Sequence, residues 1–109
     1  MSKPSSLNEY GEGMFWTSVA GNSTLIGVTQ ETINSVGDVE EIELAEVGDE
    51  FEEGDWIGEI RGRETAIEIL APYPLEIEEA NETVVSDVGM LADDPTGDAW
   101  LLRVKKRDE

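Results

Sequence analysis

The sequence predicts a single, mainly β domain with short helices, because its apolar residues fall in short runs separated by turn-forming residues. The chain has 109 residues, of which 39% are hydrophobic and 30% are charged. That length is typical of one domain, and that composition is typical of a soluble globular protein. Short β-like runs with Gly, Pro, Asn and Asp between them favour a sandwich or a barrel.

The N-terminal part of the chain predicts an arm followed by a hairpin. Residues 1–13 are rich in Ser, Gly and charged side chains, and we expect them to form a flexible arm. Residues 15–19 and 25–28 are apolar runs on either side of Gly21 and Asn22. Two such runs around a Gly-Asn turn indicate a β-hairpin.

A short helix is expected after this hairpin. Thr29 is of the residue type that caps helix N-termini, and Ile33 and Val36 would share one helical face. Gly37 can end the helix in a backbone conformation that other residues adopt with difficulty.

Three strands and a tight turn are predicted in the middle of the chain. Residues 39–44 place apolar side chains on one face of a strand and acidic side chains on the other. Further strands are expected at residues 56–60 and 66–70. Residues 61–64 lie between them as a polar, Gly-containing segment, which is typical of a hairpin turn.

The C-terminal part predicts a strand, a helical stretch and a final strand. Residues 75–78 alternate between apolar and acidic side chains, as in a half-buried strand. Asn81 is expected to cap a helical stretch that reaches about Leu91, and residues 99–104 are expected to form the last strand. Residues 106–109 are expected to be a frayed tail.

The charge balance excludes some classes of partner. The chain has 7 Lys and Arg against 26 Asp and Glu, for a formal net charge of -19. Nucleic acids and anionic membranes both require basic patches, so neither is expected as a partner. Two explanations of the acidity stay open, namely solubility in a salty cytoplasm and electrostatic steering toward a basic partner.

No catalytic or metal site is expected from the sequence. The chain has neither His nor Cys, which removes the commonest general base and the thiolate nucleophile. Asp93, Asp94 and Asp98 resemble the start of a calcium loop, but Lys105 stands where the closing glutamate would be. We therefore predict a protein that is not an enzyme and binds no metal.

Two further patterns concern location and core. No apolar run is long enough to cross a membrane, and the N-terminus lacks an apolar signal segment, so a cytoplasmic protein is expected. Trp16, Trp56 and Trp100 each lie in an apolar strand pattern, and we expect them to contribute to the core.

Several segments, in order and at the right spacing, resemble one known family. Residues 37–48 read GDVEEIELAEVG, residues 51–55 read FEEGD, and residues 94–101 read DPTGDAWL. They are similar to GDIVFVELPEVG, FEKGD and DPYGEGWL of the H protein of the glycine cleavage system. Trp16 and residues 26–29, IGVT, also match that family's pattern.

The resemblance implies a fold and a chemical role. H proteins have a flattened barrel-sandwich hybrid fold of the lipoyl- and biotinyl-domain type, which is expected here over residues 14–105. In the family, a lysine at the tip of a β-hairpin is linked to lipoate and carries an aminomethyl group between partner enzymes. Glu64 occupies the lysine position here, and no lysine lies between Lys3 and Lys105. Lipoate is therefore not expected to be attached.

The function expected from this departure is that of an H-protein-like scaffold that binds partners without carrying lipoate. Its partners would be glycine cleavage enzymes, lipoate-handling enzymes or unrelated proteins. The expected contact is the hairpin tip, formed by Arg61, Gly62, Arg63, Glu64 and Thr65.

Two alternatives stay open. The chain could serve as an ordinary H protein in glycine decarboxylation. It could also bind a small molecule in the groove where lipoate would rest, because Phe15 and Ile67 would make that groove more apolar than in the family.

Overall fold

The computed structural model describes residues 7–11, 13–95 and 99–107. Its elements, in chain order, are β1 (Leu7–Tyr10), β2 (Phe15–Ala20), β3 (Ser23–Val28), α1 (Gln30–Val36), β4 (Val39–Leu44), β5 (Glu50–Phe51), β6 (Trp56–Gly62), β7 (Ala66–Leu70), β8 (Leu75–Ala80), α2 (Glu82–Ser86), α3 (Gly89–Asp93) and β9 (Leu102–Lys106).

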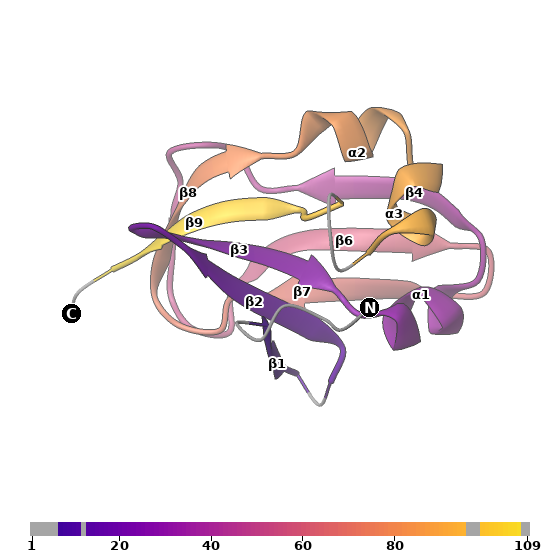
Figure 1. The fold of residues 1–109 in the computed structure, drawn as a ribbon, viewed down its shortest axis with the longest axis horizontal. Coiled ribbons are helices and arrows are strands. Elements are labelled where there is room, and N and C mark those ends of the chain that lie inside the picture. Colours follow the sequence, from indigo (N-terminus) through magenta and orange to yellow (C-terminus); the bar gives the residue numbers. More distant parts are fainter. Residues whose placement is uncertain (1–6, 12, 96–98, 108–109) are drawn as a thin grey trace.

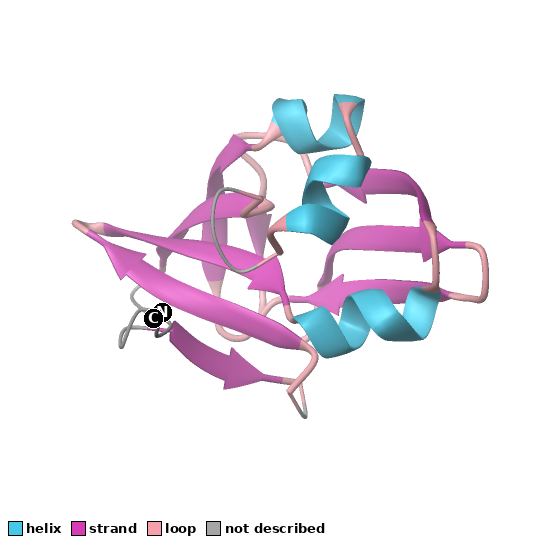
Figure 2. Ribbon diagram, turned by 45° about the vertical axis from the view of Figure 1, so that its right-hand side comes forward, coloured by secondary structure: helices cyan, strands magenta, loops and turns pink. Residues whose placement is uncertain are grey.

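These strands form two antiparallel sheets. One sheet has the strand order β1-β2-β3-β9-β8-β5, and the other has the order β4-β6-β7 (Figure 1). The helices gather toward the end of the molecule where β6 turns into β7 (Figures 1 and 2). The predicted mainly β fold with short helices is thus confirmed, and none of the described helices is long and apolar enough to span a membrane.

The hydrophobic core lies between the two sheets and draws side chains from both. It is built almost entirely from aliphatic residues, among them Ile26, Val28, Leu75, Ile77, Leu102 and Val104 of the larger sheet and Ile42, Ile57, Ile60 and Ile69 of the smaller one. The alternation of apolar and acidic residues in the sequence places the acidic side chains on the outer faces. This pattern accounts for a stable core in a chain with so many carboxylates.

Trp16 holds the first hairpin to the segment that follows α3. Its side chain is only 2% exposed, and it lies across Gly27 on the neighbouring strand. The indole N–H donates hydrogen bonds to the carbonyl oxygens of Val28, at 3.0 Å, and Pro95, at 2.9 Å. Trp16 is therefore buried as predicted, whereas Trp56 and Trp100 are only half-buried.

The N-terminal arm differs from the prediction. Residues 7–10 of the expected arm form β1, which pairs with β2 from Leu7 opposite Ser18 to Tyr10 opposite Phe15. Pairing with β2 orders this segment, although its own sequence lacks an apolar pattern. Residues 1–6 of that arm lie outside the described residues.

The C-terminal third also differs from the prediction. The expected single helical stretch is divided into α2 and α3, and the last strand begins at Leu102 and includes Lys106, which was expected in the frayed tail. Pairing with β3 and β8 determines these bounds, since Leu102 lies opposite Ile26 and Lys106 opposite Leu75. Asp98 of the excluded calcium loop lies outside the described residues, and no metal-binding group is found among the others.

Thr29 and Asn81 occupy the predicted N-cap positions without capping through their side chains. The Thr29 hydroxyl donates instead to the Gly13 carbonyl oxygen at 2.7 Å, and the Asn81 amide donates to the Trp100 carbonyl oxygen at 2.7 Å. Both polar side chains therefore tie distant segments together, a use that local sequence does not indicate.

Replacement of Gly27 by Ala should destabilise the protein strongly. A Cβ at this position would overlap the Trp16 ring, and the rigid indole is held by two hydrogen bonds. We expect a loss at the upper end of roughly 1–3 kcal/mol, typical of overpacking, measured by urea unfolding. Gly89→Ala is the control, because its Cβ would meet only ordinary contact at 3.6 Å from Asp87. Equal stability of the two variants would contradict the assigned packing of Trp16.

Salt should stabilise the protein. Cross-strand pairing places Glu43 opposite Glu59 and Glu59 opposite Glu68, so three carboxylates form one row across the smaller sheet. Like charges directly opposite one another destabilise a sheet, and salt screens their repulsion. The free energy of unfolding should rise as NaCl is added, and less steeply in Glu43→Gln. A fall in the free energy of unfolding as NaCl is added would show that the ion pairs outweigh the repulsion between carboxylates.

Candidate functional site

The β6–β7 turn brings the five residues of the predicted contact together at one end of the smaller sheet. Arg61 lies opposite Ala66 as the last pair of the ladder. The Gly62 N–H then donates to the Thr65 carbonyl oxygen at 2.9 Å, which closes the turn. Arg63 and Glu64 form the tip.

Backbone hydrogen bonds attach this tip to the connection between α1 and β4. The Arg63 N–H donates to the Asp38 carbonyl oxygen at 2.8 Å, and the Glu64 N–H donates to the Val36 carbonyl oxygen at 2.9 Å. These bonds involve only main-chain groups, so they are independent of the charged side chains. The tip is therefore held in one position on the body of the protein.

Two glycines make this attachment sterically possible. A Cβ on Gly62 would overlap the Val36 carbonyl group, so only glycine fits this close approach. Gly37 has a φ of 78°, and a Cβ on it would lie 2.8 Å from Cγ of Glu64. The φ of Gly37 is positive as predicted, but its ψ of -148° lies outside the left-handed helical conformation expected of a C-terminal cap. Its contact with the hairpin is visible only in the folded structure.

The two arginines of the predicted contact differ in their surroundings. The Arg61 guanidinium lies 3.1 Å from Glu59 and 3.6 Å from Glu41, and its hydrogen bond to Glu59 raises its pKa further above the usual value. Within the described part of the chain, no carboxylate lies at ion-pair distance from Arg63. Of the two arginines in the predicted contact, Arg63 is therefore the one that forms no ion pair with a described residue.

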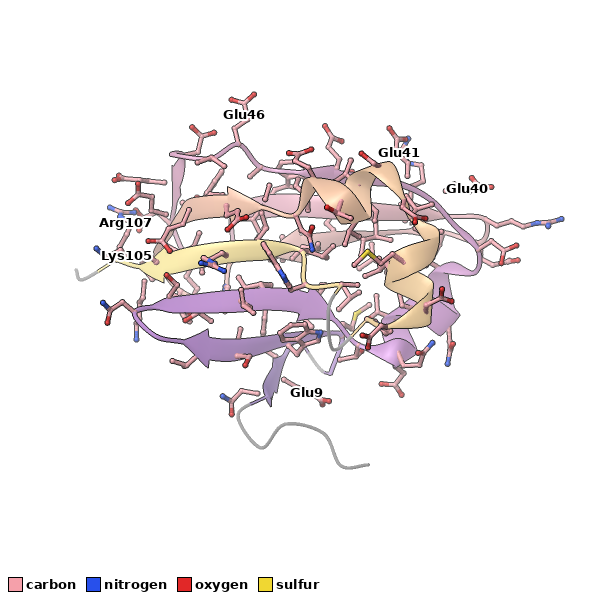
Figure 3. The ribbon with its side chains drawn as sticks, turned by 45° about the horizontal axis from the view of Figure 1, so that its top comes forward. Glu9, Glu40, Glu41, Glu46, Lys105 and Arg107 are labelled. Atoms are coloured by element: carbon pink, nitrogen blue, oxygen red, sulfur yellow. The ribbon has the colours of Figure 1, made fainter. Side chains whose placement is uncertain are left out.

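The side chains of the tip include no amine. Among the described residues the lysines are Lys105 and Lys106, and both lie on β9 of the larger sheet. Figure 3 shows Lys105 and Arg107 at the opposite end of the molecule from Glu40 and Glu41. Since Arg61 pairs with Glu41, these lysines are remote from the hairpin tip.

Phe15 and Ile67 line the same groove. The sequence analysis placed both of them in one groove because of the resemblance to H proteins. This groove encloses about 690 Å³ between β7 and the segment before β2, and its walls include Met14, Phe15, Ile67 and Leu70. A neighbouring hollow of about 340 Å³ shares Phe15 and Leu70 and continues to Pro72. Sequence reasoning missed Met14 and Leu70 because each lies in a segment whose pattern does not reveal its neighbour.

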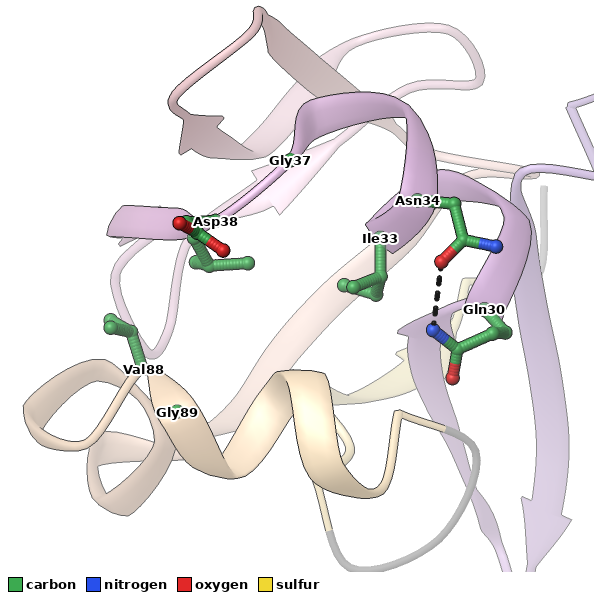
Figure 4. A pocket seen from close by; sticks show the side chains of 8 residues that line it. Gln30, Ile33, Asn34, Gly37, Asp38, Val88 and Gly89 are labelled. Carbon is green, nitrogen blue, oxygen red and sulfur yellow. Dashed lines mark hydrogen bonds between the residues drawn. The ribbon is translucent and has the colours of Figure 1, made fainter.

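A second cavity lies beside the tip, between α1 and α3. It has a volume of about 480 Å³ and is lined by Ile33, Asp38, Val88 and others (Figure 4). Gln30 and Asn34 form a side-chain hydrogen bond of 3.2 Å across one turn of α1 at its rim (Figure 4). Nothing in the local sequence predicts this cavity, because α1 and α3 are distant in the chain.

Replacement of Gly62 by Ala should detach the hairpin tip. The added methyl group cannot be accommodated against the Val36 carbonyl without moving the backbone, so we expect a loss of roughly 1–3 kcal/mol. Hydrogen exchange at the Arg63 and Glu64 amides should accelerate more than exchange in the core. Thr65→Ala, an exposed change in the same turn, should shift stability by less than about 0.5 kcal/mol. Unchanged protection of both amides in Gly62→Ala would contradict the attachment.

Comparison with known proteins identifies the family. A family model described as glycine cleavage H-protein matches residues 7–109. The glycine cleavage system H protein 1 of Caldanaerobacter subterraneus subsp. tengcongensis is 37% identical over 100 residues, covering 92% of this chain and 79% of that protein. The glycine cleavage system H protein of Staphylococcus haemolyticus is 34% identical over 109 residues, covering 100% of this chain and 86% of that protein.

A solved structure shares the fold. The crystal structure of a glycine cleavage system H protein from Mycobacterium marinum superimposes with a TM-score of 0.85 at 27% identity. The match covers 94% of this chain and 85% of that one. The chain therefore belongs to the glycine cleavage H-protein family, which is a family of carriers rather than enzymes.

Proposed function

We propose that this chain is an H-protein-shaped binding module that carries no lipoate of its own. The observation that supports the proposal is the chemistry of the hairpin tip, where Arg63 and Glu64 stand in place of an amine. An amide bond to lipoate requires a nucleophilic amine, which a carboxylate cannot supply. Arg63 offers a guanidinium rather than an amine, and it does not form this amide bond either. The residues at the tip thus do not fit covalent attachment of lipoate.

The proposed contact with a partner protein is the tip itself, residues 61–65. Its backbone is already held by Val36 and Asp38, so binding would require little further ordering. Arg63 projects from an otherwise acidic chain and can pair with a carboxylate of a partner. The partners we propose are enzymes that recognise the shape of an H protein, namely glycine cleavage or lipoate-handling enzymes.

The ordinary carrier role is the alternative. The relatives are named as H proteins of the glycine cleavage system, and these names support the carrier role more directly than they support the adaptor role. The carrier role would require a lipoyl group on this chain, and the described lysines, Lys105 and Lys106, are remote from the hairpin. The two functions therefore differ in a covalent modification that can be measured.

Binding of a small molecule is a second alternative, and the groove supports it. Phe15 and Ile67 both line the 690 Å³ groove, together with Met14 and Leu70. Lipoamide, added as a free compound, would raise the melting temperature of the protein if this alternative held, and Ile67→Asp would abolish the rise.

Mass spectrometry of the intact protein should show an unmodified chain, whether isolated from its host or incubated with a lipoate ligase, ATP and lipoate. The variant Glu64→Lys places an amine at the tip and should gain the mass of one lipoyl group. Arg63→Lys is the control, because it adds the same amine one residue away, and it should be modified far less. A lipoyl group on the parent chain would overturn the proposal in favour of the carrier role.

Loss of the Arg63 cation should weaken partner binding. With purified glycine cleavage and lipoate-handling enzymes, we expect Arg63→Ala to lower affinity by about tenfold for the true partner, since removing one member of a charge pair acts on association and dissociation. Lys105→Ala removes the same charge at the far end and should leave binding unchanged. Equal affinity of the two variants, measured by calorimetry, would place the contact elsewhere.

A further inference from the structure

Strand β7 is one of the two edges of the smaller sheet, and its backbone groups face the groove. In the sheet order β4-β6-β7, no strand of residues 7–11, 13–95 and 99–107 other than β6 pairs with β7. Ala71 exchanges backbone hydrogen bonds with Gly54 and Asp55, so its N–H and C=O point toward the β6 side. Because successive residues of a strand alternate in direction, the backbone groups of Ala66, Glu68 and Leu70 point toward the free edge.

Tyr10 provides independent evidence for this direction. Its hydroxyl donates a hydrogen bond of 3.0 Å to the Leu70 carbonyl oxygen, and Tyr10 belongs to β1 of the larger sheet rather than to β6. Burial, with a smaller contribution from Tyr73, raises the pKa of Tyr10 well above its usual value, so this donor stays protonated. The edge of β7 thus accepts a hydrogen bond at Leu70. From there, Ala66 and Glu68 continue the edge toward the hairpin tip.

The surroundings of this edge combine apolar and acidic side chains. The groove along β7 has Phe15, Ile67 and Leu70 on its walls, and Leu70 is 40% exposed. Glu59 and Glu68 also line it. Glu59 forms an ion pair with Arg61 at 3.1 Å, whereas Glu68 forms no ion pair within the described part of the chain. Within the described part of the chain, the groove therefore combines apolar side chains, edge backbone groups of Ala66 and Glu68 without a strand partner, and negative charge.

We propose that this groove binds an extended, basic segment of a partner protein, which adds as a strand to the free edge of β7. Main-chain hydrogen bonds to Ala66 and Glu68 would give affinity, as in other cases of strand addition. Apolar side chains of the segment would pack on Ile67 and Leu70, and a Lys or Arg between them would pair with Glu68. This surface adjoins the hairpin tip but uses the edge of β7 rather than residues 61–65, so the inference does not rest on the proposed function.

The charge argues against two other occupants. A second copy of this chain would bring its own Glu68 and a net charge of -19 to the same edge, and like charges would repel. A compact apolar ligand would cover Glu68 and the edge backbone groups without pairing them, and burial of unpaired polar groups is unfavourable. An extended basic segment can pack on the apolar side chains, form hydrogen bonds with the edge backbone groups and pair with Glu68.

The probe for this proposal is a capped peptide of alternating Lys and Val, eight residues long by design, titrated into the intact protein by calorimetry. Two control peptides keep its length. One replaces Lys by Glu, and the other keeps Lys and Val but is N-methylated at alternate backbone positions, which removes strand hydrogen bonds without changing charge. We expect binding of the first peptide only, together with slower hydrogen exchange at the Ala66 and Glu68 amides.

Matched variants locate the contact. Glu68→Lys should lower the affinity for the Lys-Val peptide by about tenfold or more through like-charge repulsion, and Glu46→Lys makes the same charge change at an exposed position after β4 (Figure 3). Arg63→Ala should bind the peptide as tightly as the parent does. Failure of the strand-addition proposal can therefore be distinguished from failure of the proposed partner contact at the hairpin tip. Equal binding of the N-methylated peptide, equal losses in Glu68→Lys and Glu46→Lys, or self-association through β7 would each overturn the proposal.

Discussion

The close approach of Gly62 to the Val36 carbonyl joins the two parts of this molecule that carry its chemistry. On one side is the β6–β7 hairpin, and on the other is the end of α1, whose last residue is fully buried. Because no side chain stands between them, the Glu64 amide reaches the Val36 carbonyl oxygen and the Arg63 amide reaches that of Asp38. The position of the tip and the shape of the cavity beside it both depend on this contact.

Because the tip is attached through its backbone, the side chains at the tip can be replaced without moving the hairpin. The hydrogen bonds use backbone groups only, so the side chains at positions 63 and 64 are exposed and do not hold the hairpin in place. A lysine, a glutamate or another polar residue could be presented from the same backbone. The family fold can therefore persist while the chemistry at the tip changes, which is why membership of the family does not by itself establish the carrier function.

The acidity of the chain has two structural consequences. Carboxylates lie opposite one another on the outer face of the smaller sheet, where they repel. Three of the six described cations form ion pairs, namely Arg61, Arg103 with Glu79 at 3.6 Å, and Arg107 with Glu52 at 2.8 Å. Arg63 forms no ion pair with a described residue and lies at the hairpin tip, and Glu68 is an available anion in the groove. Arg63 at the hairpin tip and Glu68 in the groove therefore present charges of opposite sign to partners.

The sequence alone determined the fold class, most strand positions, the burial of Trp16 and the positive φ at Gly37. These features follow from alternation of apolar residues and from residue types with narrow conformational preferences, which act over a few positions. It also determined that no amine stands at the hairpin tip. Only the tertiary structure decided that residues 7–10 form a strand, that the last strand starts at Leu102, and that Arg61 is paired while Arg63 is not. Each of these depends on a partner far away in the chain, and local preferences contain no information about which distant group will be the neighbour.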